Sequence, residues 1–237
     1  MAATAVIGAG GPTGSECVKR LLELGQPAVA IVRDPQKYKD AFGNDKNLRL
    51  LSGDVTDAAS LKSAFKEGHV KNVIFAASGK TYWSAKSVDE QGVGNTLEAA
   101  ASNNVDHIVL VSSALVTPKN RLHPIRIILN NIRWGLMDAK FRGENLLREG
   151  RVAYTVVRPG GLTNDSPGQK QVIASQGDAG NAGRIARSDV ARVCVAALNS
   201  TAAKNVTVEL FSKDGSQAAS EIDSIFNGLK PDNGLAK

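Results

Sequence analysis

The fold is decided by one stretch of the chain, Thr4-Ala5-Val6-Ile7-Gly8-Ala9-Gly10-Gly11-Pro12-Thr13-Gly14. Its short β-branched run predicts a strand, and glycines spaced GxxGxxG lead from it into a segment with apolar residues at helical spacing. A strand, a glycine turn and a helix start, in this order, bring backbone N–H groups close to a pyrophosphate. A tight turn without a ligand is the alternative. The context favours dinucleotide binding by the residues Gly8, Gly10, Gly11, Pro12, Thr13 and Gly14.

Strand-like and helix-like patterns alternate along the rest of the chain. Near-continuous apolar runs predict strands at 28–32, 48–51, 73–77, 107–111, 154–157 and 206–211. Helical patterns lie between them, with Asp57 and Ser188 as expected caps and a short helix around 222–226. The alternation predicts an α/β fold, a single doubly wound Rossmann-type parallel sheet with helices on both faces. We expect one NAD(P)-binding domain over 1–229, whose loops form the substrate region, and a loose tail over 230–237.

Composition excludes several classes of protein. No apolar run approaches the ~20 residues of a membrane span, and no targeting segment is recognised in this chain, so we expect a soluble protein. Cys17 and Cys194 lie among apolar residues and are expected to be buried and reduced. The three histidines have no metal-ligand spacing, so no metal site is expected. The net charge of +6 suits an anionic cofactor or surface, without the basic tracts typical of nucleic-acid binding.

Residues after the second, third and fourth strands are candidates for cofactor binding. Arg33 offers a planar fork for a phosphate and Lys37 adds a second cation, which favours NADP(H). The alternative makes Asp34 the ribose ligand of an NAD-binding unit. Asp54 and Val55 suit a contact with the adenine edge, or a turn capped by the Asp54 carboxylate. Small residues end the fourth strand, as close approach to a cofactor ribose requires: Ala76, Ala77 and Ser78.

With these pieces in family order, the chain resembles the atypical short-chain dehydrogenases/reductases. Within them it is most similar to plant and cyanobacterial NAD(P)-binding proteins of chloroplasts, related to the NADP-binding subunit of the inner-envelope import translocon. The resemblance implies a chloroplast location, in the stroma or at the thylakoid surface. It rests on the glycine stretch and on the further matches Val32-Arg33-Asp34, Gly53–Asp57, Val111-Ser112-Ser113, Lys140 with Glu144, Tyr154–Leu162 and Ala186–Ala191.

The usual chemistry of this family needs a Ser, a Tyr and a Lys, the last two spaced YxxxK on the helix after the fifth strand. The resemblance places Ser112 or Ser113 at the Ser position and Lys140 at the Lys position. It also implies that Ser112 and Lys140 adjoin the cofactor. Leu136 stands where the Tyr belongs, and it cannot transfer a proton. A pair with Glu144 on a solvated helix face is the alternative for Lys140. Tyr82 begins a YxxxK match that follows the fourth strand and not the fifth, in a segment expected to be a loop, and a catalytic role for it is the weaker interpretation.

The resemblance further implies that Pro159, Gly160 and Gly161 lay their backbone against the nicotinamide, whereas a Pro-Gly turn is the alternative. The leading hypothesis is an NADP(H)-dependent oxidoreductase that transfers hydride to a small organic acceptor such as a quinone, a flavin or a carbonyl compound. The rival hypothesis is a catalytically silent NADP(H)-binding module for redox sensing or scaffolding, and the missing tyrosine supports it.

The segment 119–134 mixes basic residues with Ile and Leu and ends at Trp134. Two interpretations are open. In the favoured one, Ile127, Ile128 and Ile132 are buried as a lid over the substrate mouth and the arginines are solvated. In the other, the segment is a docking face for an anionic membrane or an acidic protein.

Overall fold

In a computed structural model of the 237-residue chain, residues 2–79, 81–132, 135–179, 183–215, 222 and 224–232 are described, for Tyr82, Trp83 and Ile132 without their side chains. The strands are β1 (Ala3–Ile7), β2 (Ala28–Val32), β3 (Leu48–Ser52), β4 (Val70–Phe75), β5 (His107–Val111), β6 (Ala153–Pro159), β7 (Gly161–Thr163), β8 (Gln171–Ser175), β9 (Arg184–Ala186) and β10 (Val206–Lys213). The α-helices are α1 (Pro12–Glu23), α2 (Ala58–Gly68), α3 (Tyr82–Ala85), α4 (Gly92–Ser102), α5 (Pro124–Ile132), α6 (Leu136–Glu149) and α7 (Arg187–Asn199).

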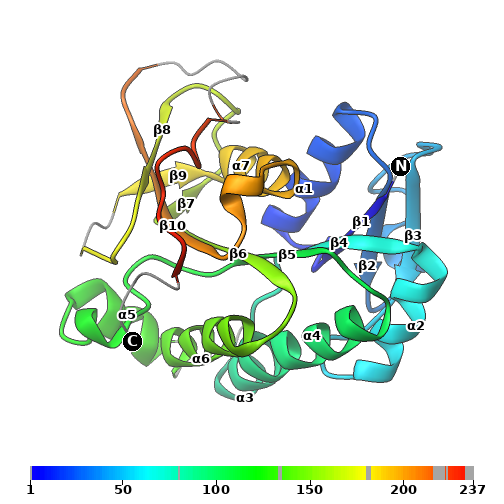
Figure 1. Ribbon diagram of the computed structural model, residues 1–237, viewed down its shortest axis with the longest axis horizontal. Helices are drawn as coiled ribbons and strands as arrows, with labels where there is room; N and C mark the ends of the chain where they lie inside the picture. The colour runs from blue at the N-terminus through cyan, green and yellow to red at the C-terminus, as the bar shows by residue number, and fades with distance from the viewer. Residues whose placement is uncertain are drawn as a thin grey trace.

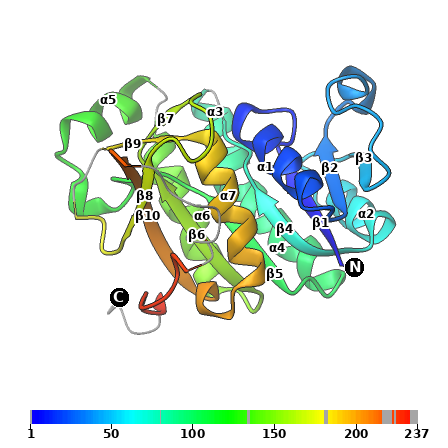
Figure 2. The same ribbon diagram turned by 90° about the horizontal axis from the view of Figure 1, so that it is seen from above.

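Eight strands form the central sheet in the order β3-β2-β1-β4-β5-β6-β10-β8. All neighbouring pairs are parallel except β10 with β8. Helices α1 and α7 cover one face of the sheet side by side, and α2, α4 and α6 cover the other (Figures 1 and 2). The strand order reverses between β1 and β4, and in doubly wound folds a dinucleotide binds at that point, outside the carboxyl ends of the strands.

The core has two parts because both faces of the sheet are apolar. One cluster joins α1 and α7 to residues such as Val6 and Val109, and the other joins α2 and α4 to residues such as Ile7 and Ile108. Adjacent residues of one strand thus point to opposite faces. Cys17 on α1 and Cys194 on α7 are both buried and free, as the sequence predicts, and they lie on the two helices that pack against each other.

The predicted doubly wound Rossmann-type fold is confirmed, and β2 coincides with its predicted run. The sequence missed β8, an antiparallel edge strand, and the short parallel pair of β7 with β9. Asp57 caps α2 as predicted, because its carboxylate accepts a hydrogen bond from the backbone N–H of Ala59. The predicted cap Ser188 is wrong: it lies inside α7, and its hydroxyl donates to the carbonyl of Asp165.

The end of the chain is partly tied to the sheet. The Asp232 carboxylate accepts hydrogen bonds from Thr207 and Tyr154, at 2.6 and 2.9 Å, and the Lys230 backbone N–H donates to Gln176. Lys230 and Asp232 lie in the segment 230–237, which the sequence analysis predicts to be a loose tail. Residues 233–237 lie outside the described part of the chain.

Candidate functional site

The glycine loop is shaped by close backbone contacts. Gly8 has a φ of +77°, which glycine adopts without strain, and the Gly11 N–H donates to the Gly8 carbonyl at 2.9 Å. A Cβ atom on Gly14 would lie 2.2 Å from the Gly8 oxygen, so only glycine fits there. Helix α1 starts directly after this turn, and no side chain caps its first N–H groups. The loop therefore leaves a helix start open to an anion such as a pyrophosphate.

The loop after β4 packs against the glycine loop. The Ala76 N–H donates to the Ile7 carbonyl, and a Cβ on Gly8 would lie 2.7 Å from the Ala77 nitrogen. Ala76 and Ala77 are half-buried and Ser78 is exposed. The small residues that the sequence assigns to the cofactor thus lie directly beside the predicted pyrophosphate loop.

Two cationic side chains follow β2. Arg33 and Lys37 are exposed, and no hydrogen bond or ion pair of their side chains occurs within the described part of the chain. The Asp34 carboxylate instead accepts a hydrogen bond at 3.1 Å from the Gln36 N–H and caps a short 3₁₀ helix, η1 (Pro35–Tyr38). The arrangement leaves the positive charges of Arg33 and Lys37 available to a phosphate. One oxygen of Asp34, the alternative ligand for a cofactor ribose, is engaged by the Gln36 N–H.

Tyr38, the last residue of η1, lies over the glycine loop. A Cβ on Gly10 would fall 2.3 Å from the ring carbon that carries the Tyr38 hydroxyl, so the absence of a side chain at Gly10 makes room for this ring. The ring also contacts Phe42, with a centroid separation of 6.4 Å. The phenol oxygen lies 2.6 Å from that same Cβ position, next to the loop. Sequence reasoning missed Tyr38, because no local pattern relates η1 to the glycines.

Asp54 forms the turn after β3. Its Oδ1 accepts hydrogen bonds from the backbone N–H and the hydroxyl of Thr56, at 2.9 and 2.8 Å. One carboxylate oxygen of Asp54 therefore caps a turn, as the alternative interpretation of the sequence predicts. Contact of Asp54 or the buried Val55 with an adenine stays a prediction.

Ser112, just beyond β5, belongs to a buried charge network. Its hydroxyl donates to Glu144 Oε1 at 2.5 Å, and Glu144, which is fully buried, also accepts from Arg158 at 2.6 and 3.0 Å and from Arg148 at 2.9 Å. Burial favours the neutral form of the Glu144 carboxyl, but the charges and hydrogen bonds of Arg158, the charge of Arg148 and the hydrogen bond from Ser112 outweigh it. The pKa of Glu144 is lowered, so the carboxylate stays ionised and accepts the hydrogen bond from the Ser112 hydroxyl.

Lys140, on α6, forms a buried ion pair across two helices. Its Nζ lies 2.8 Å from Asp89 Oδ1, on the π-helical turn η2 (Lys86–Gln91), with side-chain exposures of 10% and 1%. The other oxygen of Asp89 accepts the Gly79 N–H at 2.8 Å, in the loop after β4. The expected alternative, a solvated pair with Glu144, is wrong because both side chains are buried and each bonds to another element.

The residue at the tyrosine position of the family motif, Leu136, also has apolar surroundings. Leu136 begins α6 and is 5% exposed, in a small cluster with Ala85 and Ala139. The second motif match lies on α3, so the segment 82–85 is helical and not the expected loop. The side chain of Tyr82 is outside the described residues, and its catalytic role stays a prediction.

Pro159 ends β6, so the alternative interpretation of this stretch, a Pro-Gly turn, is wrong. The Gly160 N–H donates to the Leu210 carbonyl on β10, and the Gly161 N–H donates to the Gly183 carbonyl. A Cβ on Gly160 would lie 2.1 Å from the Gly183 oxygen. The two glycines thus let three backbone segments meet beyond the carboxyl end of β6, and their contact with a nicotinamide stays a prediction.

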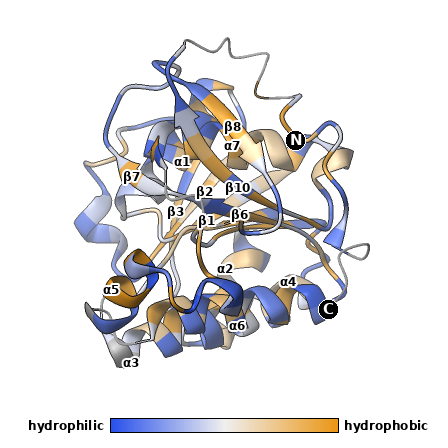
Figure 3. Cartoon of the chain, turned by 90° about the vertical axis from the view of Figure 1, so that its left-hand side faces the viewer, coloured by the Kyte–Doolittle hydropathy of each residue, from blue (hydrophilic) through white to orange (hydrophobic). Residues whose placement is uncertain are grey.

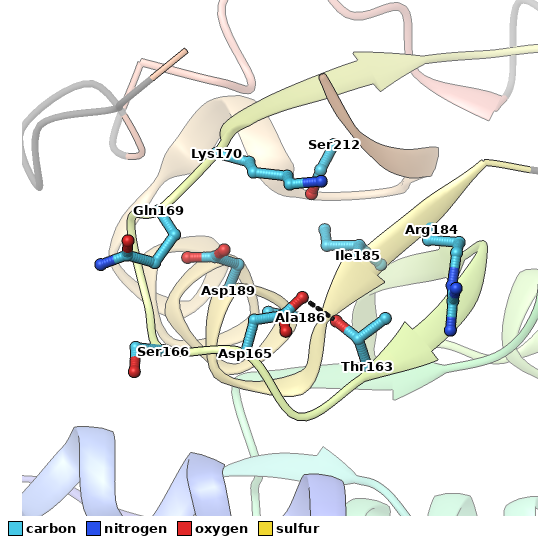
Figure 4. A pocket seen from close by; sticks show the side chains of 10 residues that line it. All are labelled: Thr163, Asp165, Ser166, Gln169, Lys170, Arg184, Ile185, Ala186, Asp189 and Ser212. Carbon is cyan, nitrogen blue, oxygen red and sulfur yellow. Dashed lines mark hydrogen bonds between the residues drawn. The ribbon is translucent and has the colours of Figure 1, made fainter. Parts of the chain in front are cut away.

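A cavity of about 250 Å³ opens beyond this junction, between β7, β9 and the end of β10 (Figure 4). Its lining is largely polar, and the Thr163 hydroxyl donates to Asp165 Oδ2 at 2.7 Å across one wall. Ser112, Lys140 and Arg33 do not line it. Its residues are Thr163, Asp165, Ser166, Gln169, Lys170, Arg184, Ile185, Ala186, Asp189 and Ser212.

Comparison with known proteins places this geometry in a family. A family model described as NAD(P)H-binding matches residues 8–201, from the glycine loop to just beyond α7. The chain belongs to this NAD(P)H-binding family. The match includes every element on which the predicted cofactor residues lie, and it agrees with the open helix start after Gly11.

Chloroplast proteins are among the relatives of this chain. An uncharacterized chloroplastic protein of Arabidopsis thaliana is 34% identical over 218 residues, which cover 88% of this chain and 76% of that protein. Protein TIC 62 of Pisum sativum is 31% identical over 211 residues, 79% of this chain but only 38% of that protein. Sanguinarine reductase of Eschscholzia californica is 27% identical over 246 residues, with 87% of each chain covered.

Solved structures share the fold. A Bacillus halodurans protein assigned as an NAD-dependent epimerase/dehydratase has a TM-score of 0.81 at 22% identity, with 97% of this chain and all of that chain covered. A short-chain dehydrogenase/reductase of Veillonella parvula, solved in complex with NADP, has a TM-score of 0.72 at 14% identity, with 92% and 97% covered. Both likenesses concern the fold alone.

Proposed function

We propose that this chain is an NADPH-dependent reductase whose acceptor is a quinone, a flavin or a related conjugated ring. The bound cofactor supplies a hydride. The reductase name of one relative and the NAD(P)H-binding family of this chain support the oxidoreductase class. The main support for the acceptor class is the engaged hydroxyl of Ser112, 2.5 Å from the ionised Glu144, together with the apolar Leu136 at the tyrosine position.

The lack of a side chain that could donate a proton to the product favours a conjugated acceptor. Reduction of an isolated carbonyl leaves an alkoxide that needs a positioned acid. The Ser112 hydroxyl already donates its hydrogen bond to Glu144, and Leu136 has no proton to give. A quinone or a flavin spreads the negative charge of its reduced form over the ring system and takes a proton from water. The residues therefore suit an acceptor that needs little acid catalysis from the protein.

Preference for NADPH rests on the cations after β2. Arg33 and Lys37 would hold the 2′-phosphate, and the Tyr38 hydroxyl, beside Gly10, would add a neutral donor. A charge-assisted hydrogen bond contributes about 1.5–3 kcal/mol, so Arg33→Ala should weaken NADPH binding about tenfold to a hundredfold. Tyr38→Phe keeps the ring and should weaken NADPH by a smaller factor. NADH binding should hardly change in either variant. Equal calorimetric losses for both cofactors would refute the assignment.

The rival proposal is an NADP(H)-binding module without turnover. Its support is that the two polar groups of the family motif, Ser112 and Lys140, both bond to buried carboxylates. Incubation of the protein with NADPH and a panel of quinones, flavins and simple aldehydes separates the two. Sustained NADPH consumption with the conjugated acceptors supports the reductase. Tight NADPH binding without consumption of any panel member supports the module.

We also propose a chloroplast location, in the stroma or at the thylakoid surface, which the chloroplastic relatives support. In the described part of the chain, no helix is both long and apolar enough to span a membrane. Expression of the protein in plant cells with a fluorescent tag, followed by fractionation of chloroplasts, tests this location.

A further inference from the structure

Helix α5 presents its apolar side to solvent and its cation to the interior. Ile125, Ile127 and Ile128 are 42%, 41% and 53% exposed, whereas Arg126 is 4% exposed. At about 100° per residue, the three isoleucines spread over about 160° of the helix, and Arg126 points the opposite way. A surface helix normally buries its apolar stripe. The lid interpretation of this segment, with buried isoleucines and solvated arginines, is wrong at these described positions.

Arg126 fixes this inverted orientation. Its guanidinium donates to the carbonyls of Leu115 and Thr117, at 2.9 and 3.0 Å, and also to that of Val116. Its other terminal nitrogen lies 2.5 Å from the Asp138 carboxylate. Rotation of α5 to bury the isoleucines would remove a guanidinium from these partners and leave the carbonyls unpaired. The apolar side is therefore held outward by the buried cation.

The exposed side forms a ridge, which we call the α5 ridge and define as Leu122, Ile125, Ile127 and Ile128. Leu122, just before the helix, is 77% exposed. The helix lies at the periphery of the molecule, with orange apolar stretches in Figure 3. Scattered apolar residues are normal on a surface, but a contiguous group on one short helix indicates a contact site.

The charges around the ridge indicate what binds to it. Between Asp106 and Asp138 the sequence contains no acidic residue, and the whole chain carries a net charge of +6. Lys119 and Arg121 are exposed just before the ridge. A twofold contact between two copies of the chain would bring these cations together, which disfavours self-association. Hot spots of protein partners rely on Trp, Tyr and Arg, whereas the ridge is aliphatic.

We propose that the α5 ridge docks on an anionic lipid surface. The aliphatic side chains enter the boundary between headgroups and acyl chains, while Arg121 and Lys119 contact lipid phosphates. Apolar insertion and positive charge together are typical of peripheral helices that lie in the membrane interface. Each basic residue near such a surface contributes about a fivefold gain in affinity at moderate salt. Binding is therefore expected to weaken as the salt concentration rises.

Vesicle flotation with the whole chain tests this proposal, without NADPH so that cofactor binding plays no part. Vesicles of phosphatidylcholine are compared with vesicles in which part of it is replaced by phosphatidylglycerol. The wild-type protein should bind the anionic vesicles at low salt and bind neutral vesicles at least about tenfold more weakly. Ile125→Ser/Ile128→Ser and Arg121→Glu should each reduce binding at least about fivefold.

The control variants change equally exposed residues elsewhere. Leu24→Ser removes a leucine that is 46% exposed, just after the C-terminal end of α1. Lys66→Glu reverses an exposed charge on α2. Both should bind like the wild type. Denaturation curves of all variants establish that each is folded. Three outcomes would overturn the proposal: no binding to anionic vesicles at low salt, equal losses in the ridge and control variants, or a dimer in sedimentation velocity that Ile125→Ser/Ile128→Ser abolishes.

Discussion

Acid destabilisation through His107 follows from its burial in β5. The side chain is 1% exposed, and its Nε2 lies 2.9 Å from the Thr155 hydroxyl oxygen. Thr155 donates its own proton to the Ala203 carbonyl, so the Nε2–H of a neutral imidazole is the donor to Thr155. Burial, and next the charge of Lys204, lower the pKa of His107 from 6.5 to about 4, partly offset by a backbone hydrogen bond with Tyr154.

The magnitude follows from that difference in pKa. Between about pH 4 and pH 6.5 the unfolded chain binds a proton at His107 that the folded chain does not. The stabilisation is therefore complete above about pH 6.5 and is lost as the pH falls towards 4. A pKa difference of about 2.5 corresponds to about 3.4 kcal/mol, of which about 2.6 kcal/mol is lost by about pH 4.5.

The assay compares denaturant unfolding of the wild type and His107→Gln at several pH values down to about 4.5. Other titrating groups affect both proteins, so the difference between their pH slopes isolates His107. The wild type should lose about 2.6 kcal/mol more than the variant over this range. His69→Asn is the control, because His69 is exposed and its positive φ of 50° suits asparagine. Parallel pH profiles for wild type and His107→Gln, or an imidazole resonance of His107 that titrates near 6.5, would refute the reasoning.

Two further predictions concern packed polar and glycine positions. Lys140→Met should lower the free energy of unfolding by about 3–5 kcal/mol, because it leaves the Asp89 carboxylate buried without its cation. The addition of Asp89→Asn should recover most of that loss; no recovery in denaturation curves would contradict the ion-pair argument. Gly14→Ala should weaken NADPH binding at least about tenfold, because its methyl group would force the Gly8 carbonyl away from its place in the loop. In the control Gly94→Ala the nearest atom lies 3.6 Å from the new Cβ, so calorimetry should show unchanged binding; unchanged binding in both variants would contradict the prediction.

The sequence predicts the parallel core well because its signal is local. An apolar run such as Ala28–Val32 can be buried on both faces only as an inner strand, and it forms β2 with those bounds. Strands β7 and β9 have three residues each, and their pairing depends on chain segments about 20 residues apart. No short window of sequence contains that information. The edge strand β8 is half-buried and mixed in polarity, so it lacks the pattern of an inner strand.

The candidate site divides in the same way. The glycine loop and the cations after β2 are read from neighbouring residues. The partners of Lys140 and Glu144 cannot be read from neighbouring residues. Their spacing of four on a helix suggests that they pair with each other, whereas in the fold Lys140 pairs with Asp89 and Glu144 with Arg158. The inward position of Arg126 is likewise set by carbonyls of the loop 115–117, outside the helix, which the sequence of the helix does not reveal.

The loop 115–117, just beyond Ser112, is held from two sides by opposite charges. The Asp178 carboxylate accepts the N–H groups of Leu115 and Thr117, at 2.8 and 2.9 Å, while Arg126 binds the carbonyls of the same residues. Leu115 keeps a φ of +64° within this clamp. A molecule bound beside Ser112 would meet a rim that is already ordered, so little conformational entropy is lost there on binding. Discrimination between acceptors would then depend on their rigid shape, and the amides of Leu115 and Thr117 should exchange with deuterium as slowly as those of a core strand.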